Sequence, residues 1–349
     1  MIRVLVLGAS GYGGGELLRL LAGHPAVEGL RGVSRNHAGQ SFHAAHPNLR
    51  GLLPGTFDGQ ADWAWLAEAE RPVVFAAMPH GELARSLPEL EATWAALGLG
   101  ERLTLIDLSG DFRLKDPAAF ARHYGEAHPC PEFLGGFTYG LADLFPEDVA
   151  GARRIANPGC FATALQLGLA PLAGLEIPFL PAFAITGSSG SGMKASDTTH
   201  HPTRAHDFRA YKALDHQHLG EVEQLCDRLG LRTQVAFVPH SAPLVRGIFA
   251  TLPFALPEGL EAFDLQGRLA KVCEGRPFLR LVDGSPKVAA VVGSNFADLG
   301  LVVKGRQATL FVAIDNLLKG MAGQAVQNLN LALGLGEKTG LWFAGGYPG

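Results

Sequence analysis

Cys160 is the residue in this sequence whose placement points most directly to chemistry. It lies in "ARRIANPGCFATALQLGLAPL" (residues 152–172), directly after Asn-Pro-Gly and directly before an apolar run that predicts a helix. The first turn of a helix presents unsatisfied N–H groups and the positive end of the helix dipole. A thiol there has a lowered pKa, and the N–H groups can stabilise an oxyanion on a carbonyl under attack. We therefore predict that Cys160 is a nucleophile and that Cys130, Cys226 and Cys273 are structural.

A thiol nucleophile needs a partner that moves protons, and "YKALDHQHLGEVEQL" (residues 211–225) offers one. His216, His218 and Glu221 lie close together there, at an expected junction between a loop and a helix. A histidine can protonate a forming or departing oxygen, and the carboxylate can orient an imidazole ring. Zinc binding is the alternative because His-x-His recurs in zinc proteins. No cysteine stands nearby, so we expect no metal.

Three cations are candidates to hold a phosphate or carboxylate group of a substrate. They are Arg113 in "DLSGDFRL", Lys194 in "GSSGSGMKAS" and Arg246 in "PLVRGI". The stretch "TGSSGSGMK" adds glycines and serines whose backbone N–H groups could form a nest that holds an anion. We therefore expect an anionic substrate to be bound in part by this loop.

A dinucleotide site is predicted by "VLVLGASGYGGGELLRLL" near the N-terminus. Gly8, Gly11, Gly13 and Gly14 stand between an expected strand and an expected helix. Glycines there allow a sharp turn and let a pyrophosphate approach the N–H groups that begin the helix. A glycine pattern alone is weak evidence, but this one occurs in the strand-to-helix context that supports it.

The end of the second expected strand indicates which dinucleotide is bound. "VEGLRGVS" is followed by arginine, so that Ser34 and Arg35 stand where a carboxylate would bind the 2′-hydroxyl of NAD. A guanidinium instead matches the oxygens of a 2′-phosphate through paired hydrogen bonds. We expect NADP(H) rather than NAD.

The elements that must position these residues change character along the chain. Before Cys160, short apolar runs such as "IRVLVLG" and "RPVVFAAMP" alternate with helical patterns, which is typical of a doubly wound parallel sheet. After Cys160, longer strand-like runs such as "TQVAFVPHSAPLVRGIFATLPF" predict a mostly antiparallel sheet with one face covered. The spacing of apolar residues over 316–335 predicts a helix. The expected fold is therefore a Rossmann α/β domain followed by an α+β domain.

Composition is that of an enzyme-like globular protein with two domains. The chain has 349 residues, 47% of them hydrophobic and 18% charged, and its net charge is −4 with both signs dispersed. Neither nucleic acid nor a membrane is therefore expected as a partner. The four cysteines form no CxxC pair, and "MIRVLVLGAS" is more typical of a buried first strand than of a secretory leader, so we expect a cytoplasmic location.

Together these motifs resemble the N-acetyl-γ-glutamyl-phosphate reductase family, NADPH-dependent acyl-phosphate reductases of arginine biosynthesis related to aspartate-semialdehyde and glyceraldehyde-3-phosphate dehydrogenases. The resemblance runs nearly from end to end. It rests on "GASGYGGGELLRLL", "HPNLRG", "MPHG", "IDLSGDFRL", "YGLADL", "NPGCFATALQLGLAPL", "HQHLGEVEQ", "PLVRGI" and "DNLLKGMAGQAVQNLNLALGL".

The resemblance implies a domain division and a set of roles. It implies an NADP-binding Rossmann domain of residues 1–156 plus 317–349, and a glyceraldehyde-3-phosphate-dehydrogenase-like catalytic and oligomerisation domain of residues 157–316. Cys160 would be acylated, His216 would be the acid/base, and His218 and Glu221 would support them. The implied cofactor-binding residues are Gly8, Ser10, Gly11, Tyr12, Gly13, Gly14, Ser34, Arg35, Ser188, Gly190 and Asn316. The implied substrate-binding residues are Arg113, Asn157, Lys194 and Arg246.

Two departures from the family pattern leave the acyl group open. Gln217 stands where the family usually has arginine, and Met193 followed by Lys194 stands where it usually has Gly-Arg. The alternatives to N-acetyl glutamyl phosphate are N-succinyl glutamyl phosphate and aminoadipyl phosphate linked to the acidic carrier protein LysW. A carrier would call for a local basic surface. An NADPH sensor without chemistry is the alternative from outside the enzymes. The resemblance also implies a homo-oligomer, a tetramer or a dimer.

Overall fold

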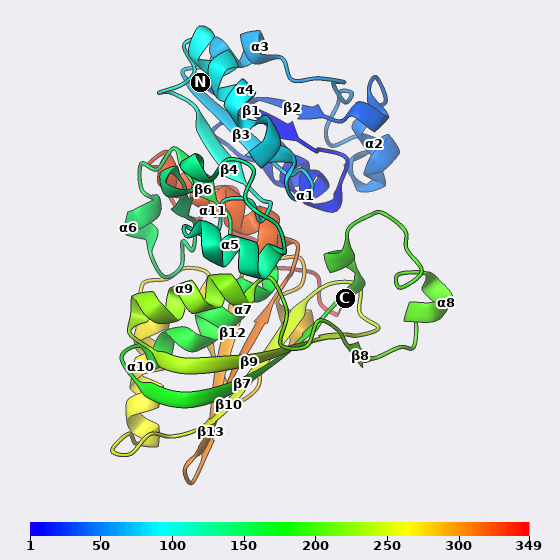
Figure 1. Cartoon of the computed structure of the whole chain (residues 1–349). Helices are drawn as coiled ribbons and strands as arrows, with labels where there is room; N and C mark the ends of the chain where they lie inside the picture. Colours follow the sequence, from blue (N-terminus) through cyan, green and yellow to red (C-terminus); the bar gives the residue numbers. More distant parts are fainter. Residues whose placement is uncertain (349) are drawn as a thin grey trace. The chain divides into compact units, whose positions relative to one another are not determined.

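The chain forms two compact units in a computed structural model that describes residues 1–348 (Figure 1). The first unit comprises Met1–Ala121, Glu126–Pro158 and Met321–Trp342. The second comprises Arg122–Gly125, Gly159–Gly320 and the chain from Phe343 onward. Gly349, the last residue of the expected tail 317–349, lies outside the described residues. The domain boundaries expected after residues 156 and 316 remain a prediction.

The first unit is built on a six-stranded sheet in which every neighbouring pair is parallel. Its strand order is β2-β1-β3-β4-β6-β5. The strands are β1 (Ile2–Leu7), β2 (Val27–Val33), β3 (Arg71–Ala76), β4 (Thr104–Asp107), β5 (Thr138–Tyr139) and β6 (Arg154–Ala156). The inner strand β1 is buried along almost its whole length, as its mostly apolar sequence predicts for a parallel sheet covered on both faces.

Helices cover both faces of this sheet. α1 (Tyr12–Ala22) packs beside α11 (Gly323–Ala332), while α3 (Trp63–Ala67) and α4 (Glu82–Ala96) share a separate apolar cluster with alternate residues of the strands. The shorter helices are α2 (Phe42–Ala45), α5 (Pro117–Tyr124) and α6 (Pro146–Val149). α11 comes from the far end of the chain, and a π turn over Leu318–Ala322 precedes it. The helix expected over residues 316–335 is therefore present.

The second unit contains a seven-stranded mixed sheet of order β11-β12-β13-β10-β7-β9-β8. The strands are β7 (Glu176–Thr186), β8 (Arg209–Ala210), β9 (Arg232–Ser241), β10 (Ile248–Ala255), β11 (Leu279–Asp283), β12 (Ala297–Lys304) and β13 (Gln307–Ile314). Two pairs, β7 with β9 and β11 with β12, are parallel, and the other pairs are antiparallel. The expected combination of a Rossmann sheet and a mostly antiparallel sheet is confirmed.

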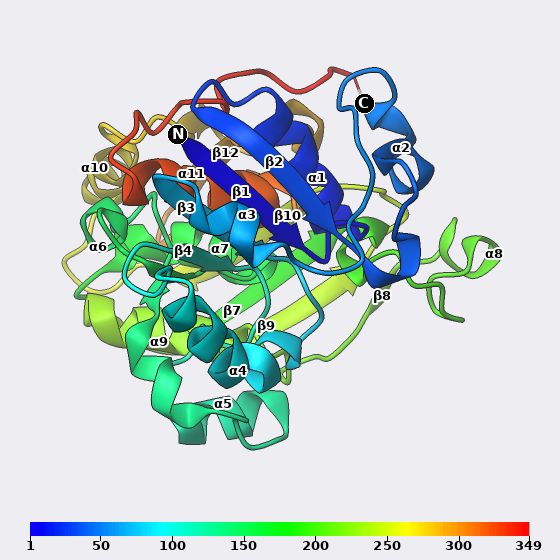
Figure 2. The same ribbon diagram turned by 90° about the horizontal axis from the view of Figure 1, so that it is seen from above.

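Helices lie against one face of the mixed sheet (Figure 1). They are α7 (Cys160–Leu169), α9 (Leu219–Leu229) and α10 (Ala262–Cys273). α7 packs on β10 and β13 and also on α9, so that every residue from Phe161 to Leu169 is buried. The short helix α8 (His201–Arg204) lies on an arm that projects from the rest of this unit (Figures 1 and 2). Within residues 1–348, no helix has the length and apolarity needed to cross a bilayer.

Candidate active site

The turn that leads into Cys160 is anchored by a buried carboxylate. Cys160 is the half-buried first residue of α7, and the N–H of Gly159 donates a hydrogen bond to Glu221 Oε2 at 2.9 Å. Glu221, in the first turn of α9, has no exposed surface. Gln166 Nε2 donates to the Glu221 carbonyl at 2.8 Å. The expected carboxylate therefore fixes the backbone before the thiol and joins α7 to α9.

His218 and Gly320 pack tightly around the same turn. A β-carbon at residue 159 would come within 2.4 Å of His218 Nε2, so a glycine is needed there for the imidazole to lie against the backbone. A β-carbon at residue 320 would come within 2.7 Å of the Cys160 β-carbon. His218 is buried. The geometry therefore gives His218 a packing role beside the thiol.

His216 lies in a cage of aromatic rings. Its ring centroid is 5.4 Å from Phe161, 5.6 Å from Phe237, 6.2 Å from Tyr211 and 4.6 Å from His218, all in steeply inclined arrangements. Only 5% of the residue is exposed, and this burial lowers the pKa of His216 to about 4, with the Lys212 charge acting in the same direction. The imidazole is therefore neutral near pH 7.

A backbone hydrogen bond selects the tautomer of that neutral ring. The N–H of His218 donates to His216 Nδ1 at 3.2 Å, so Nδ1 must carry a lone pair and the proton resides on Nε2. Protonating Nδ1 would place two N–H groups against each other. His216 can therefore donate a hydrogen bond from Nε2 to a developing oxyanion.

Tyr211 is a residue of this site that the sequence analysis did not single out. Burial raises the pKa of its phenol far above the usual value, and the negative charge of a Cys160 thiolate acts in the same direction. Its ring also borders His216. The phenol is therefore a protonated group in the electrostatic neighbourhood of the nucleophile. Its position five residues before His216 was the available signal, although aromatic residues near a histidine are too common to be specific.

Two other thiols have the surroundings of inert cysteines. Burial raises the pKa of Cys130 and of Cys226 to about 11. Cys130 also donates from Sγ to the Ala84 carbonyl at 3.1 Å. No disulfide is present among residues 1–348.

The Gly- and Ser-rich loop after β7 is held by the chain itself. The N–H groups of Gly187, Ser188 and Ser189 donate to the carbonyls of Gly247, Leu244 and Val245 at 2.8–3.0 Å. The N–H of Gly190 donates to the Gly187 carbonyl at 3.3 Å. The expected anion-holding nest is therefore wrong for residues 187–190, because these donors already have backbone acceptors.

The loop is tied to Asn316, one of the residues expected to bind the cofactor. Asn316 Nδ2 donates to Ser189 Oγ at 2.9 Å, and its Oδ1 accepts from the N–H of Gly247 at 2.7 Å. Ser188 is half-buried and Gly190 is exposed at the end of the loop. The structure thus brings Ser188, Gly190 and Asn316 into one loop cluster of the second unit.

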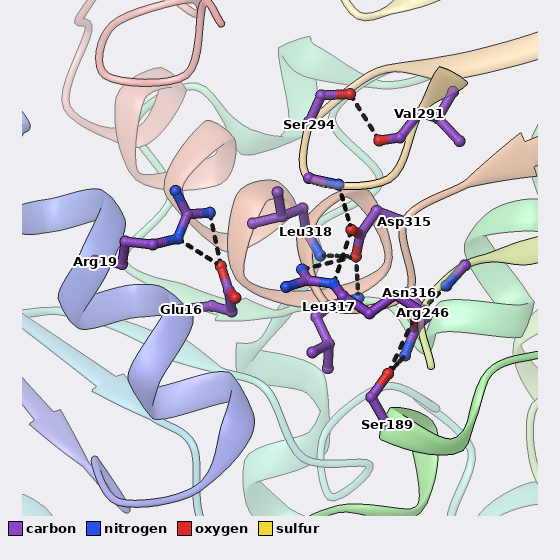
Figure 3. A network of polar contacts seen from close by, with 12 residues as sticks. Glu16, Arg19, Ser189, Arg246, Val291, Ser294, Asp315, Asn316, Leu317 and Leu318 are labelled. Atoms are coloured by element: carbon purple, nitrogen blue, oxygen red, sulfur yellow. Dashed lines mark hydrogen bonds and ion pairs between the residues drawn. The ribbon is translucent and has the colours of Figure 1, made fainter. Parts of the chain in front are cut away.

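Arg246, a candidate substrate cation, is paired within the protein (Figure 3). Its Nη2 and Nε atoms each lie 3.0 Å from a carboxylate oxygen of Asp315. Asp315 is fully buried and also accepts from the N–H groups of Gly293, Leu317 and Leu318 at 2.7–3.0 Å. Lys194 lies exposed on the arm that carries α8. Of these two cations, Arg246 is held in place and Lys194 extends into solvent.

Arg113 and Asn157 lie together in the first unit and are deeply buried. Arg113 donates from Nε to the Asn157 carbonyl at 2.8 Å and from Nη2 to the Leu108 carbonyl at 2.9 Å. The Asn157 amide donates to the Met321 carbonyl at 3.1 Å and accepts from Asn328 at 3.0 Å. These contacts fix the segment that enters Pro158. Direct binding of substrate by either side chain stays a prediction.

The turn from β1 into α1 has the geometry expected of a dinucleotide site. Gly8 has a φ of +73°, and a β-carbon there would come within 2.4 Å of the Ala77 carbonyl oxygen. Within residues 1–348, no backbone carbonyl accepts from the N–H groups of Tyr12, Gly13 or Gly14. Donors at a helix N-terminus suit the oxygens of a pyrophosphate.

The residues expected around the ribose lie at the end of β2. Ser34 is buried and donates from Oγ to Ser10 Oγ at 2.8 Å, which links the two loops of the site. Arg35 is exposed in the next turn, and no acceptor in the described part of the chain holds its guanidinium. Gly11 caps α1, and Tyr12 is exposed beside it. Binding of a pyrophosphate by the N–H groups that begin α1, and of a 2′-phosphate by Arg35, stays a prediction.

A metal site is not evident in the described chain. Across residues 1–348, no group of three or more His, Cys, Asp or Glu side chains is arranged to hold a metal ion.

Comparison with known proteins assigns both halves of the chain to one family. Residues 3–152 match the family model described as the NAD binding domain of semialdehyde dehydrogenase, and residues 160–316 match the one described as its dimerisation domain. A LysW-linked L-2-aminoadipate and L-glutamate phosphate reductase of Saccharolobus solfataricus is 40% identical, covering 97% of either chain. An N-acetyl-gamma-glutamyl-phosphate reductase of Methanopyrus kandleri is 39% identical, covering 100% of either chain.

A solved structure has the same fold. Aspartate semialdehyde dehydrogenase II from Vibrio cholerae superimposes with a TM-score of 0.66 at 17% identity, covering 95% of this chain and 98% of that one. The arrangement of a parallel sheet and a mixed sheet is therefore shared over nearly the full length.

Proposed function

This chain belongs to the semialdehyde dehydrogenase family, and from that membership we propose that it reduces an N-blocked glutamyl or aminoadipyl phosphate to the corresponding semialdehyde, with release of phosphate. The class of enzyme expected from the sequence, an NAD(P)-dependent acyl-phosphate reductase, is confirmed. The acyl group and the roles of individual residues belong to the proposal.

The observation that carries the proposal is the construction of the Cys160 turn. The sulfur begins a buried helix, the preceding N–H is fixed by Glu221, and a neutral imidazole stands in the same cluster of side chains. The thiolate attacks the acyl carbon, the phosphate leaves with its electron pair, and a thioester remains on Cys160. Helix N–H groups and His216 Nε2–H stabilise the oxyanion that forms on the carbonyl oxygen.

The cofactor proposed for this reaction is NADPH. The N–H groups that begin α1 would hold its pyrophosphate, and Ser34 and Arg35 its 2′-phosphate. When bound, it supplies the hydride that reduces the thioester carbon. Collapse of the resulting thiohemiacetal oxyanion expels the Cys160 thiolate and frees the aldehyde.

The test is the reverse reaction with variants of two half-buried thiols. Cys160→Ser should lower phosphate-dependent reduction of NADP+ by N-acetylglutamate semialdehyde or a carrier-linked aldehyde by at least about 10³-fold. The variant should still bind NADPH, measured by fluorescence. Cys273→Ser, at the end of α10, is the matched control and should retain activity. Substantial turnover by Cys160→Ser would refute the thioester route.

Two candidate substrates remain, and each has support. The sequence motifs favoured N-acetyl glutamyl phosphate, as named for the Methanopyrus relative. The Saccharolobus relative is named for LysW-linked substrates, and the arm of residues 192–214 carries Lys194, Arg209 and Lys212, none of them buried, against two carboxylates. An excess of cations suits an acidic carrier. A panel of N-acetyl, N-succinyl and carrier-linked aldehydes, compared by kcat/KM, decides between them.

The proposal includes a homo-oligomer in the cytoplasm. The matched model for residues 160–316 is described as a dimerisation domain. The face of the mixed sheet opposite α7, α9 and α10 exposes Phe179 and Phe183 of β7. A second copy of the chain is the proposed cover of this face.

A further inference from the structure

Arg204 is buried on an arm that is otherwise mostly exposed. It is the last residue of α8, and 9% of it is exposed, whereas its neighbours Thr203 and His206 are exposed. Its hydrogen bond within the described chain is a long one, from Nη2 to the Ala242 carbonyl at 3.4 Å. Its Nε atom is buried with no acceptor among residues 1–348.

Two other arginines of this unit are paired within the chain. Arg209 forms an ion pair with Asp207, and Arg246 forms one with Asp315. No carboxylate within the described residues comes within ion-pair distance of Arg204. A guanidinium has five N–H donors, and buried cations in proteins are normally matched by acceptors. Most of the hydrogen-bonding capacity of Arg204 is therefore unused.

Burial is the main effect that acts against this cation. It lowers the pKa of Arg204, the charge of Arg209 lowers it further, and the charges of Tyr211 and Asp207 act in the opposite direction. A buried guanidinium with no ion-pair partner costs stability that a bound anion would restore.

The surroundings of Arg204 connect it to the nucleophile. Its acceptor Ala242 follows β9, and the N–H of Ala242 donates to the carbonyl of Thr186 at the end of β7, the parallel neighbour of β9. Tyr211 acts electrostatically on Arg204, and Cys160 acts in turn on Tyr211. Arg204 therefore lies at the carboxyl ends of two parallel strands, in the same electrostatic cluster as Cys160.

We propose that Arg204 binds an anionic group of the substrate, either the phosphoryl group or a carboxylate, through its planar pair of N–H donors. It takes the part that the sequence analysis gave to Lys194 and Arg246. Only the assignment of this anion to the substrate rests on the proposed function, because anion binding by Arg204 can be measured without turnover.

The experiment measures the binding of inorganic phosphate and of N-acetylglutamate by calorimetry, with the dinucleotide site saturated by NADP+. In Arg204→Met, the Kd for one of these anions should rise at least about tenfold, since a charge-assisted fork is lost. Lys271→Met removes an exposed cation in the last turn of α10 and should change neither Kd by more than about twofold. The anion whose Kd rises identifies the bound group. A Kd within about twofold of the wild-type value for both anions in Arg204→Met would overturn the proposal.

A structural arginine and a ligand-binding one differ in what their removal does to stability. Without added anion, Arg204→Met should have a Tm equal to or above that of the wild type, because a desolvated charge is gone. A lower Tm with retained anion affinity would assign Arg204 to structure alone. Should the methionine variant fail to fold, Arg204→Lys decides. The lysine keeps the charge but loses the planar pair of guanidinium N–H donors. An anion affinity lowered about three- to tenfold would therefore support the proposed site, and an unchanged anion affinity would exclude it.

Failure of this inference is distinct from failure of the proposed function. Loss of anion binding in Arg204→Met would stand even if no acyl phosphate were reduced. Conversely, the loss of activity in Cys160→Ser would stand even if Arg204→Met bound both anions normally.

Discussion

At the scale of single residues, the surroundings of His216 favour a neutral imidazole, and its expected role as acid and base stays a prediction. The aromatic cage disfavours an imidazolium, and the His218 N–H occupies Nδ1. The groups that contact the ring or act on its charge are Tyr211, Lys212 and His218 from its own loop, Phe161 from α7 and Phe237 from β9. None of the ring contacts or charge effects recorded at His216 involves a carboxylate. We therefore propose that His216 acts as a neutral donor at Nε2.

This form of His216 predicts a particular dependence on pH. Because the folded pKa is about 4, kcat should show no decline from His216 protonation between about pH 6 and 7. His216→Gln keeps an N–H donor and should retain more activity than His216→Ala. A limb near pH 6.5 in the wild type that vanishes in His216→Gln would contradict the neutral form.

The lowered pKa of His216 should also make the folding stability depend on pH. The unfolded chain takes up a proton on this ring near its ordinary pKa of 6.5, and the folded protein only near 4. Folding stability therefore falls as pH drops from about 6.5 to about 4, and this contribution is constant above that window. The difference in Tm between wild type and His216→Gln, followed across that window, measures it.

At the scale of elements, the join between α7 and α9 sets the position of the nucleophile. Glu221→Gln retains an acceptor for the Gly159 N–H, whereas Glu221→Ala leaves that buried donor unsatisfied. We expect the alanine variant to lose about 1–3 kcal/mol of unfolding free energy in urea, and the glutamine variant less. The alkylation rate of Cys160 should change more in the alanine variant. Equal rates and equal stabilities would exclude a positioning role for Glu221.

Those parts of the site that depend on neighbours in sequence could be predicted, and those that depend on distant partners could not. The helix that begins at Cys160 was expected from the apolar run after Asn-Pro-Gly, and the turn from β1 into α1 was expected from its glycines. Within the nest expected over residues 186–194, the N–H groups of residues 187–189 donate to the loop at 244–247, and that of Gly190 donates to the Gly187 carbonyl. The sequence could not show either that Arg204 has no ion-pair partner among the described residues, because this depends on where carboxylates lie after folding.

At the scale of the whole molecule, the face of the mixed sheet opposite α7, α9 and α10 is the proposed contact with a second copy of the chain. Along β7, Ala182 and Ala184 face the helices and are buried, while Phe179 and Phe183 are 58% and 41% exposed. Such a row of large apolar side chains is typical of a permanent interface.

A charge on this face should separate the copies. Phe183→Glu would bury an unpaired carboxylate in the proposed interface and should shift sedimentation toward the monomer. Phe263→Glu is the matched control, because Phe263 is 81% exposed on α10, on the helical side of the sheet. An unchanged oligomer in Phe183→Glu would exclude this face as the contact.

The ion pair between Asp315 and Arg246 also limits which substitutions these two positions can accept during evolution. One carboxylate serves an arginine and three amides from segments widely separated along the chain. Replacing the arginine alone would strand a buried negative charge, so each position limits the substitutions that the other tolerates. Among descendants of this chain, positions 246 and 315 should covary rather than mutate singly.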